Sequence, residues 1–262
     1  MRDLNLFKSL SKHARIIGAL MMREIVTRYG REGIGFLWLV GEPLLFCIGV
    51  LVLWSAIKPE YEHGIRVGPF VMTGYVCLLL LRHAISMSLT ALQANIGLLH
   101  HRSVRILHIY LSRNILEFAG TTVAFIIVYA ILFGMGQVHL PSDPMILYAG
   151  WFSLAWLSMG LALTLSGMAL YSDVVERLVP VITYILIPLS GAFFMLSFIP
   201  TGYREVLLWV PIPHTVEMVR AGVFGEFVKT YYTWWYPLAW GTLLNLIGLL
   251  LLARAKRLVD IE

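Results

Sequence analysis

Six long apolar stretches limit what this chain of 262 residues can fold into. At about 1.5 Å per helical residue, each is long enough to cross about 30 Å of hydrocarbon. They cover residues 36–57, 69–89, 115–136, 146–171, 178–199 and 235–253. A soluble domain could not bury a composition that is 59% hydrophobic and only 13% charged. The sequence therefore predicts an all-α polytopic membrane protein with six transmembrane helices, one transmembrane domain over residues 1–262.

The basic residues predict its orientation. Of the 20 Lys and Arg residues, 15 lie before the first span, between spans two and three, between four and five, or after the sixth. This count assigns Arg82, near the end of the second span, to the loop that follows. Because cytoplasmic loops collect Lys and Arg, we expect both termini in the cytoplasm. The net charge is +5, and we expect the basic residues to contact anionic membrane lipids. We do not expect this chain to bind nucleic acid.

Residues 4–29 have the pattern of an amphipathic helix. One apolar stripe recurs every three or four residues and comprises Leu6, Leu10, Ala14, Ile17, Met21 and Ile25. Lys and Arg residues fall on the other faces. We expect a helix that lies in the membrane interface. The alternative is an ordinary helix packed on a soluble domain, for which this chain has no room.

No motif for catalysis is present. The sequence has no G-x-x-x-x-G-K-[ST] phosphate loop, no H-E-x-x-H and no C-x-x-C. The one histidine cluster, at His100, His101 and His108, has no carboxylate partner at ligand spacing. We expect no catalytic residue, no metal site and no cofactor bound by this chain. Cys47 and Cys77 lie in apolar runs and are expected to be free thiols.

Charged residues inside the spans are costly and favour a functional role. Glu42 stands beside Pro43, after a glycine-rich stretch, so a kinked first span could form a lateral opening toward lipid. The alternative is a plain turn into the membrane, with Glu42 reaching water. Arg82 and His83 interrupt the second span and indicate either a helix break or a wet, pore-facing position.

Two segments between the spans are also unusual. Residues 93–113 are basic and amphipathic, which is typical of a docking surface for a cytoplasmic partner or of a solvated loop helix. Residues 200–233 are apolar for a loop, and Pro211 and Pro213 divide them into two short helices. Such a pair would suit a re-entrant gate at the outer mouth. The Trp residues near the span ends are either interface anchors or part of a sugar path.

Three stretches carry a family resemblance. They are MREIVTRYGREGIGFLWLVGEPLL (22–45), ANIGLLHHRSVRILHIYLSRNILE (94–117) and WVPIPHTVEMVRAGVFG (209–225). Together they resemble the permease subunits of type 2 ABC exporters, in particular the capsular polysaccharide export branch. Two positions depart from that pattern: Val210 stands where the family has Asn, and His108 where an acidic residue is expected.

The resemblance implies a channel-forming homodimer in the bacterial inner membrane. Two separate ATPase subunits would bind ATP and Mg²⁺ in the cytoplasm and drive export of a lipid-linked capsular polysaccharide. Periplasmic and outer-membrane capsule export proteins would carry the polymer onward. Open alternatives are a permease for O-antigen, teichoic acid or another polymer, a membrane-embedded glycan or lipid enzyme, and a non-catalytic scaffold. Co-purification of an ATPase would separate the exporters from the others.

The resemblance and the charge pattern also suggest three groups of site residues. The expected substrate-binding residues are Arg23, Arg28, Arg31, Trp38, Glu42, Tyr75, Arg82 and Tyr184. Coupling to the ATPase is expected at Leu98, Leu99, His100, His101, Arg102, Arg105 and His108. The periplasmic gate residues are expected to be Trp209, Pro211, His214, Glu217 and Arg220.

Overall fold

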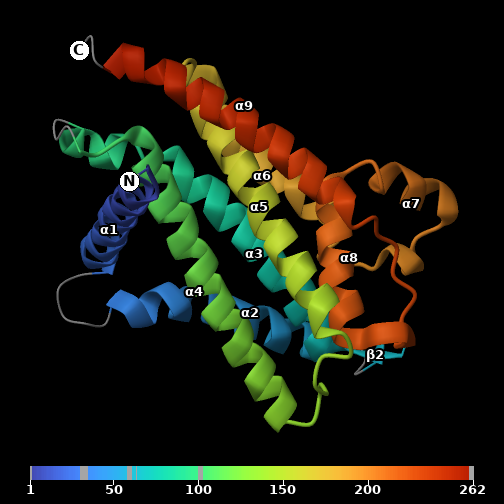
Figure 1. Ribbon diagram of the computed structural model, residues 1–262. Helices are drawn as coiled ribbons and strands as arrows, with labels where there is room; N and C mark the ends of the chain where they lie inside the picture. Colours follow the sequence, from blue (N-terminus) through green and yellow to red (C-terminus); the bar gives the residue numbers. More distant parts are fainter. Residues whose placement is uncertain (1, 30–34, 58–60, 63, 100–102, 260–262) are drawn as a thin grey trace.

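The computed structural model describes the chain except residues 1, 30–34, 58–60, 63, 100–102 and 260–262 (Figure 1). The described residues are mostly helical. The α-helices are α1 (Arg2–Tyr29), α2 (Gly35–Ile57), α3 (Val67–Leu89), α4 (Ile106–Gly134), α5 (Pro144–Ala169), α6 (Asp173–Leu189), α7 (Thr201–Leu207), α8 (Pro211–Phe224) and α9 (Trp235–Val259). Short 3-10 turns are η1 (Gln93–Leu98), η2 (Leu196–Phe198) and η3 (Gly225–Phe227). Strands β1 (Tyr61–Glu62) and β2 (Ile65–Arg66) form one antiparallel pair.

Four of these helices are long and apolar enough to cross a membrane: α3, α4, α5 and the Trp235–Ala255 part of α9. They correspond to the second, third, fourth and sixth predicted spans. Helix α2 contains a shorter apolar stretch, Val40–Trp54, and α6 has only 17 residues. Seventeen residues extend about 26 Å, less than the hydrocarbon thickness of about 30 Å. The first and fifth spans therefore stay predictions.

Three expectations about the elements need correction. Helix α4 begins at Ile106, inside the region expected to be a separate coupling helix, because Ile106, Ile109 and Tyr110 are buried against α1 and η1. Helix α6 ends at Leu189, ten residues before the predicted end of the fifth span, and the chain then turns at Gly191 with a φ of 73°. Helix α3 runs unbroken through Arg82, so a helix break there is wrong.

Helix α5 is the centre of the bundle and packs against α3, α8 and α9. Its approach to α9 depends on glycine. A Cβ added at Gly160 would lie 2.8 Å from the carbonyl oxygen of Gly241, and one at Gly241 would lie 2.7 Å from a ring carbon of Trp156. Small residues let helix backbones approach closely in membranes, where van der Waals packing drives association. Thr164 adds a bond across the same contact by donating to the carbonyl of Leu244 at 2.7 Å.

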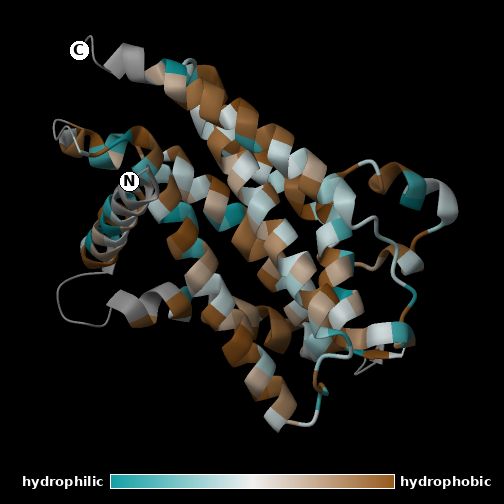
Figure 2. Ribbon diagram, viewed as in Figure 1, coloured by the Kyte–Doolittle hydropathy of each residue, from teal (hydrophilic) through white to brown (hydrophobic). Residues whose placement is uncertain are grey.

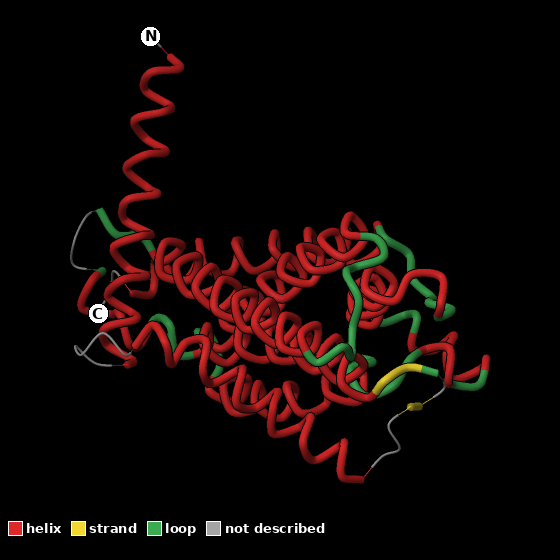
Figure 3. The backbone as a smooth tube through the Cα atoms, turned by 90° about the horizontal axis from the view of Figure 1, so that it is seen from below, coloured by secondary structure: helices red, strands yellow, loops and turns green. Residues whose placement is uncertain are grey.

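Helix α1 lies across the other helices. Figure 3 shows it extending away from the bundle, and it contacts the remainder through α4 and α2. Figure 2 shows hydrophobic residues along the long helices, with hydrophilic residues gathered on α1, near the start of α4 and around α7. Helix α1 and the C-terminal part of α9 lie at the same end of the bundle (Figure 1). This arrangement places α1, η1 and the start of α4 close together.

Candidate functional site

A buried ion pair joins α1 to the start of α4. The Arg113 Nη2 atom lies 3.0 Å from Glu24 Oε1, and the two side chains are only 6% and 10% exposed. Arg113 Nη1 also donates to the carbonyl of Met87 at 2.5 Å and to Thr90 Oγ1 at 3.2 Å. Arg113 therefore connects three elements: the interior face of α1, the first turns of α4 and the end of α3.

Two further polar contacts hold α1. Arg23 donates a hydrogen bond to the side-chain oxygen of Asn95, in η1. Asn95 is itself held in place because its amide donates to the carbonyl of Ala91 at 2.9 Å. The second contact joins His13 Nδ1 and His108 Nε2 at 2.8 Å. Since His108 Nδ1 accepts a bond from the backbone N–H of Arg105 at 3.1 Å, we assign the proton between the rings to His108 Nε2.

We call this set the α1–α4 joint; its members are His13, Arg23, Glu24, Asn95, His108 and Arg113. Apolar contacts surround it, with Leu20, Ile106 and Ile109 in one buried cluster and Leu98 and Leu99 half-buried against it. The joint therefore ties the expected interface helix to the expected coupling region. Glu24, Asn95, His108 and Arg113 are buried in it, whereas His13 is half-buried and Arg23 is exposed.

The predicted coupling residues are divided by this arrangement. Arg105 is exposed, whereas His108 is only 4% exposed and faces α1. His100, His101 and Arg102 lie outside the described residues. The predicted role of these residues in docking to an ATPase stays a prediction.

A second group lies between α3 and α6. The guanidinium carbon of Arg82 lies 5.1 Å from the ring centroid of Tyr184. Tyr75, seven residues before Arg82 and so on the same side of α3, is half-buried with its ring centroid 6.3 Å from that of Phe193. We call Tyr75, Arg82 and Tyr184 the α3–α6 wall. Of these three predicted substrate-binding residues, the structure places Arg82 directly against Tyr184 and Tyr75 two helical turns away on α3.

The surface of α6 around this wall is apolar and uncovered in the single chain. Val174, Leu178, Val181 and Ile185 are all between 48% and 65% exposed. Near the start of α6, Gln93 donates to Glu176 Oε1 at 3.2 Å. An exposed apolar face of this extent indicates contact with lipid or with another protein chain.

The remaining predicted substrate residues are spread over α1 and α2. Arg23 has a protein partner in the α1–α4 joint, and Glu42 is half-buried on α2. The side chains of Arg28 and Trp38, and all of Arg31, lie outside the described residues. Their predicted role at a substrate entry stays a prediction.

The third group is a buried cluster in α8. Arg220 is fully buried and donates to the carbonyl oxygens of Gly191 at 2.9 Å, Phe194 at 2.7 Å and Ala192 at 2.8 Å. Glu217 lies 3.4 Å from Arg220. By satisfying three carbonyls of one turn, Arg220 fixes the chain that follows α6 onto α8.

Glu217 and His214 hold two other segments to α8. Glu217 accepts bonds from the backbone N–H groups of Tyr231 at 3.1 Å and Leu196 at 3.4 Å. His214 Nε2 donates to the carbonyl of Leu208 at 2.9 Å, and its Nδ1 accepts from the N–H of Thr233 at 2.9 Å. This pair of bonds needs a neutral ring, and burial lowers the pKa of His214, against a smaller opposite effect of the Leu208 carbonyl.

The predicted gate residues differ in where their side chains lie. His214, Glu217 and Arg220 point into the protein and hold the segments after α6, after α7 and before α9 onto α8. Trp209 is 79% exposed, and Pro211 is the first residue of α8, where a proline needs no N–H partner. Trp209 is the member of this group whose side chain is available for contact outside the chain.

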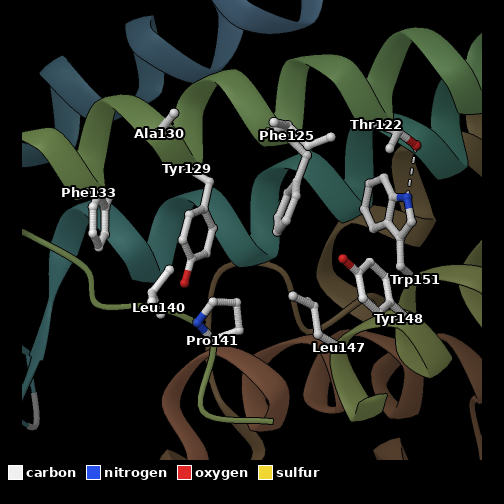
Figure 4. A pocket seen from close by; sticks show the side chains of 11 residues that line it. Thr122, Phe125, Tyr129, Ala130, Phe133, Leu140, Pro141, Leu147, Tyr148 and Trp151 are labelled. Carbon is white, nitrogen blue, oxygen red and sulfur yellow. Dashed lines mark hydrogen bonds between the residues drawn. The ribbon is translucent and has the colours of Figure 1, made fainter. Parts of the chain in front are cut away.

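A pocket of about 370 Å³ opens between α4 and α5 (Figure 4). Its walls include the rings of Phe125, Tyr129 and Trp151. The polar atoms of two rings are satisfied within the protein, because Tyr129 donates to the carbonyl of His139 at 2.6 Å and Trp151 Nε1 donates to Thr122 Oγ1 at 2.9 Å. Tyr148 also lines the pocket, whose remaining walls are mostly hydrocarbon. Within the part of the chain that the structure describes, no group of three or more His, Cys, Asp or Glu residues is placed to hold a metal ion.

Sequence reasoning missed several members of the α1–α4 joint. Arg113 carried a usable signal, since it is a charge in a long apolar helix, whereas Glu24 is one of several charged residues in α1. His13 and Asn95 carried none: their partners lie 95 and 72 residues away. Only the packing of α1 across α4 and η1 makes these contacts.

These features define a class of protein. Long apolar helices, an arginine within a membrane-spanning helix and a buried connection to an amphipathic helix are typical of the membrane subunit of a transporter. The family model described as "ABC-2 type transporter" matches residues 15–224. The chain belongs to the ABC-2 type transporter family.

Related proteins match nearly the full length. The chain is 36% identical over 260 residues to the "Capsule polysaccharide export inner-membrane protein CtrC" of Neisseria meningitidis serogroup B, covering 99% of this chain and 98% of that protein. It is 37% identical over 259 residues to "Capsule polysaccharide export inner-membrane protein BexB" of Haemophilus influenzae, covering 98% of each. It is also 28% identical over 213 residues to "Polysialic acid transport protein KpsM" of Escherichia coli, covering 81% of this chain and 83% of that protein.

Proposed function

We propose that this chain is the channel-forming permease subunit of an ATP-driven exporter, which moves lipid-linked capsular polysaccharide across the bacterial inner membrane. The observation that carries the proposal is similarity over 98–99% of the chain to inner-membrane proteins named for capsule polysaccharide export. The family match and the apolar helices support it.

Two copies of the chain form the channel, with two ATPase subunits bound on the cytoplasmic side. ATP and Mg²⁺ belong to the ATPase subunits. The uncovered apolar face of α6 supports an association with a second copy. Periplasmic and outer-membrane capsule export proteins receive the polymer.

Both termini lie in the cytoplasm in this proposal. The Lys and Arg distribution supports this orientation, and so does the position of α1 and the C-terminal part of α9 at one end of the bundle. Helix α1 then lies in the cytoplasmic interface, across the direction of the spans, and its Leu10 and Met22 side chains are 59% and 63% exposed toward lipid.

The α1–α4 joint carries movement from the ATPase to the entry side of the channel. Coupling residues in the 93–113 region contact the ATPase, and Arg23, Arg28, Arg31, Trp38 and Glu42 lie on the substrate's entry path. Because Glu24 and Arg113 form a buried pair, a shift of the coupling region moves α1 as well. The polymer then passes the α3–α6 wall and leaves beside the start of α8, where Trp209 is exposed.

Complementation tests the function. A capsulated strain that lacks its own inner-membrane capsule permease is given this chain together with its cognate ATPase. Antibody staining then measures polymer on the surface of intact cells and polymer retained in permeabilised cells. We expect surface polymer to return; polymer that stays inside, despite normal membrane levels of the chain, would contradict the proposal.

Complementation also separates a capsule permease from a permease for another polymer. Export of O-antigen or a teichoic-acid-type polymer by this chain, without capsule export, would favour a permease of other specificity. Purification in mild detergent provides the second criterion. A co-purifying ATPase at equal stoichiometry supports an exporter, whereas a chain that processes a glycan or lipid without an ATPase would be a membrane enzyme.

A further inference from the structure

Arg82 lies inside a membrane-spanning helix and has no acidic partner among the described residues. It stands seven residues, about 10 Å, before the end of α3 at Leu89. The ion pairs in the described part of the chain do not include it, and its Nε atom is buried without a hydrogen bond. The neighbouring His83 lies 3.6 Å from Glu117, so that carboxylate has its own partner.

The side chain does not reach for water at the end of the helix. Long basic side chains near a helix end commonly extend toward the interface. Here the guanidinium lies against Tyr184, which is eight residues, about 12 Å, further along α6 than Glu176. Glu176, the acidic residue near that end, is bonded to Gln93 instead. Arg82 is therefore held within the span by an aromatic ring.

The ring stabilises the cation without using the N–H groups of the two Nη atoms, whereas Nε is buried. A guanidinium carries five N–H groups in a planar fork that matches the oxygens of a carboxylate or a phosphate. A face-on aromatic contact stabilises the charge and uses none of those N–H groups. Tyr184 is 62% exposed, so the pair lies at the surface of the α3–α6 wall, and no hydrogen bond of its hydroxyl to a described residue is recorded.

From this geometry we infer that Arg82, supported by Tyr184, binds an oxyanion of the exported molecule as it passes the α3–α6 wall. The inference rests on the proposed function and adds a substrate requirement: the transported molecule carries a phosphate or carboxylate. Two sources share this chemistry, the phosphate of a lipid anchor and the carboxylates of acidic sugars. A neutral polymer on an uncharged anchor would not be recognised here.

The test compares two pairs of variants with a matched control. Arg82→Gln removes the charge and Arg82→Lys keeps it without the fork; Tyr184→Phe keeps the ring and Tyr184→Leu removes it. Arg204→Gln is the control, because Arg204 also lies over a ring, that of Tyr231 at 4.1 Å, but at the outer end of the chain. Membrane levels and the midpoint of thermal unfolding of each purified complex show whether it folds.

Export and binding are both measured. We expect surface polymer to fall about tenfold in Arg82→Gln and Tyr184→Leu, less in Arg82→Lys and Tyr184→Phe, and to stay unchanged in Arg204→Gln. Binding to the purified permease–ATPase complex is followed by intrinsic tryptophan fluorescence. The probes are dodecyl phosphate, short oligogalacturonate and, as a neutral control, dodecyl maltoside.

Each result either assigns the oxyanion that Arg82 binds or overturns the inference. Loss of dodecyl phosphate binding in Arg82→Gln assigns the site to a lipid phosphate, and loss of oligogalacturonate binding assigns it to acidic sugars. Equal binding of both probes by wild type and Arg82→Gln, or normal export by Arg82→Gln, would overturn the inference. If Arg82→Gln fails to fold, the comparison of Arg82→Lys and Tyr184→Leu with wild type gives the same decision. Failure of the wild-type chain to restore any export is a different result, which counts against the proposed function.

Discussion

At the scale of single residues, the buried ion pairs determine which segments of the chain are joined. A buried charge whose partner is removed is costly, since its desolvation is no longer compensated. Glu24 with Arg113, and Glu217 with Arg220, are the two Arg–carboxylate pairs of this kind in the described residues. Each pair lies where one helix is joined to a segment distant in the sequence.

Removing Glu24 tests the α1–α4 joint. Glu24→Gln leaves Arg113 buried without its carboxylate, and we expect the complex to lose about 3 kcal/mol of stability and to export less polymer. Thermal unfolding in detergent and surface polymer measure the two effects. Glu176→Gln is the matched control: it removes a half-buried carboxylate bonded to Gln93 and should cost about 0.5 kcal/mol or less. Equal effects of the two substitutions would contradict a special role of the joint.

We expect His214 to make the contacts of α8 sensitive to acid. Burial lowers the pKa of this residue, so the folded protein keeps the ring neutral while the unfolded chain takes up a proton below about pH 6.5. The unfolded state then binds more protons, and stability must fall as the pH falls through this range. We expect the unfolding midpoint of the wild type to drop more between pH 7.5 and pH 5 than that of His214→Asn. Parallel curves for the two proteins would show that His214 does not contribute.

At the scale of elements, the contact between α5 and α9 depends on small residues. Gly160 and Gly241 place one backbone against the other, and Asn245 donates across the contact to the carbonyl of Trp156 at 3.0 Å. The helices themselves follow from the sequence, because runs of 20 apolar residues form helices in a membrane whatever they contact. Which helices touch follows instead from the match between glycines on one and side chains on the other.

A single methyl group tests this contact. Gly160→Ala brings a Cβ to within 2.8 Å of the Gly241 carbonyl oxygen, so α5 and α9 must move apart, at a cost of about 2 kcal/mol. Gly134→Ala, at the end of α4, adds the same group where no atom lies within 4 Å and should have little effect. Thermal unfolding and yield in detergent measure both. A neutral Gly160→Ala would mean that the two helices pack less closely than the structure describes.

At the scale of the whole molecule, α1 and the C-terminal part of α9 define one face of the bundle. Helix α1 lies across the long helices, and the C-terminal part of α9 lies at the same end of the bundle (Figures 1 and 3). Lys and Arg residues gather in the same segments of the sequence. The proposed orientation, with this face toward the cytoplasm, follows from the preference of cytoplasmic segments for Lys and Arg.

Reporter fusions test the orientation. Green fluorescent protein fused to either terminus should fluoresce, and alkaline phosphatase at the same positions should be inactive, because these reporters work on opposite sides of the inner membrane. Insertion of the phosphatase after residue 229, in the loop between η3 and α9, provides the opposite control and should be active. Different results for the two termini would require an odd number of spans and would contradict the six-span prediction.

Part of the candidate site was predictable from the sequence. Arg82 stood out because a charge inside an apolar stretch is costly, and the Pro211–Arg220 segment stood out through its family motif. What the motif does was not predictable: His214, Glu217 and Arg220 look like gate residues in the sequence, yet they point into the protein and bind backbone groups of other segments. The end of α6 was missed because its apolar run continues past Leu189, while the backbone turns where Arg220 binds the carbonyl groups.

By itself, the sequence determined that this chain is helical and that α3, α4, α5 and α9 are long and apolar enough to cross a membrane, since hydropathy acts locally and needs no partner. The tertiary structure alone decided which residues meet. Glu24 meets Arg113, Arg82 meets Tyr184, and His13 meets His108, a residue 95 positions away in the chain. The physical reason is that such contacts depend on how α1 crosses α4 and how α3 packs on α6, and side-chain packing between distant segments leaves no periodic signal in either one.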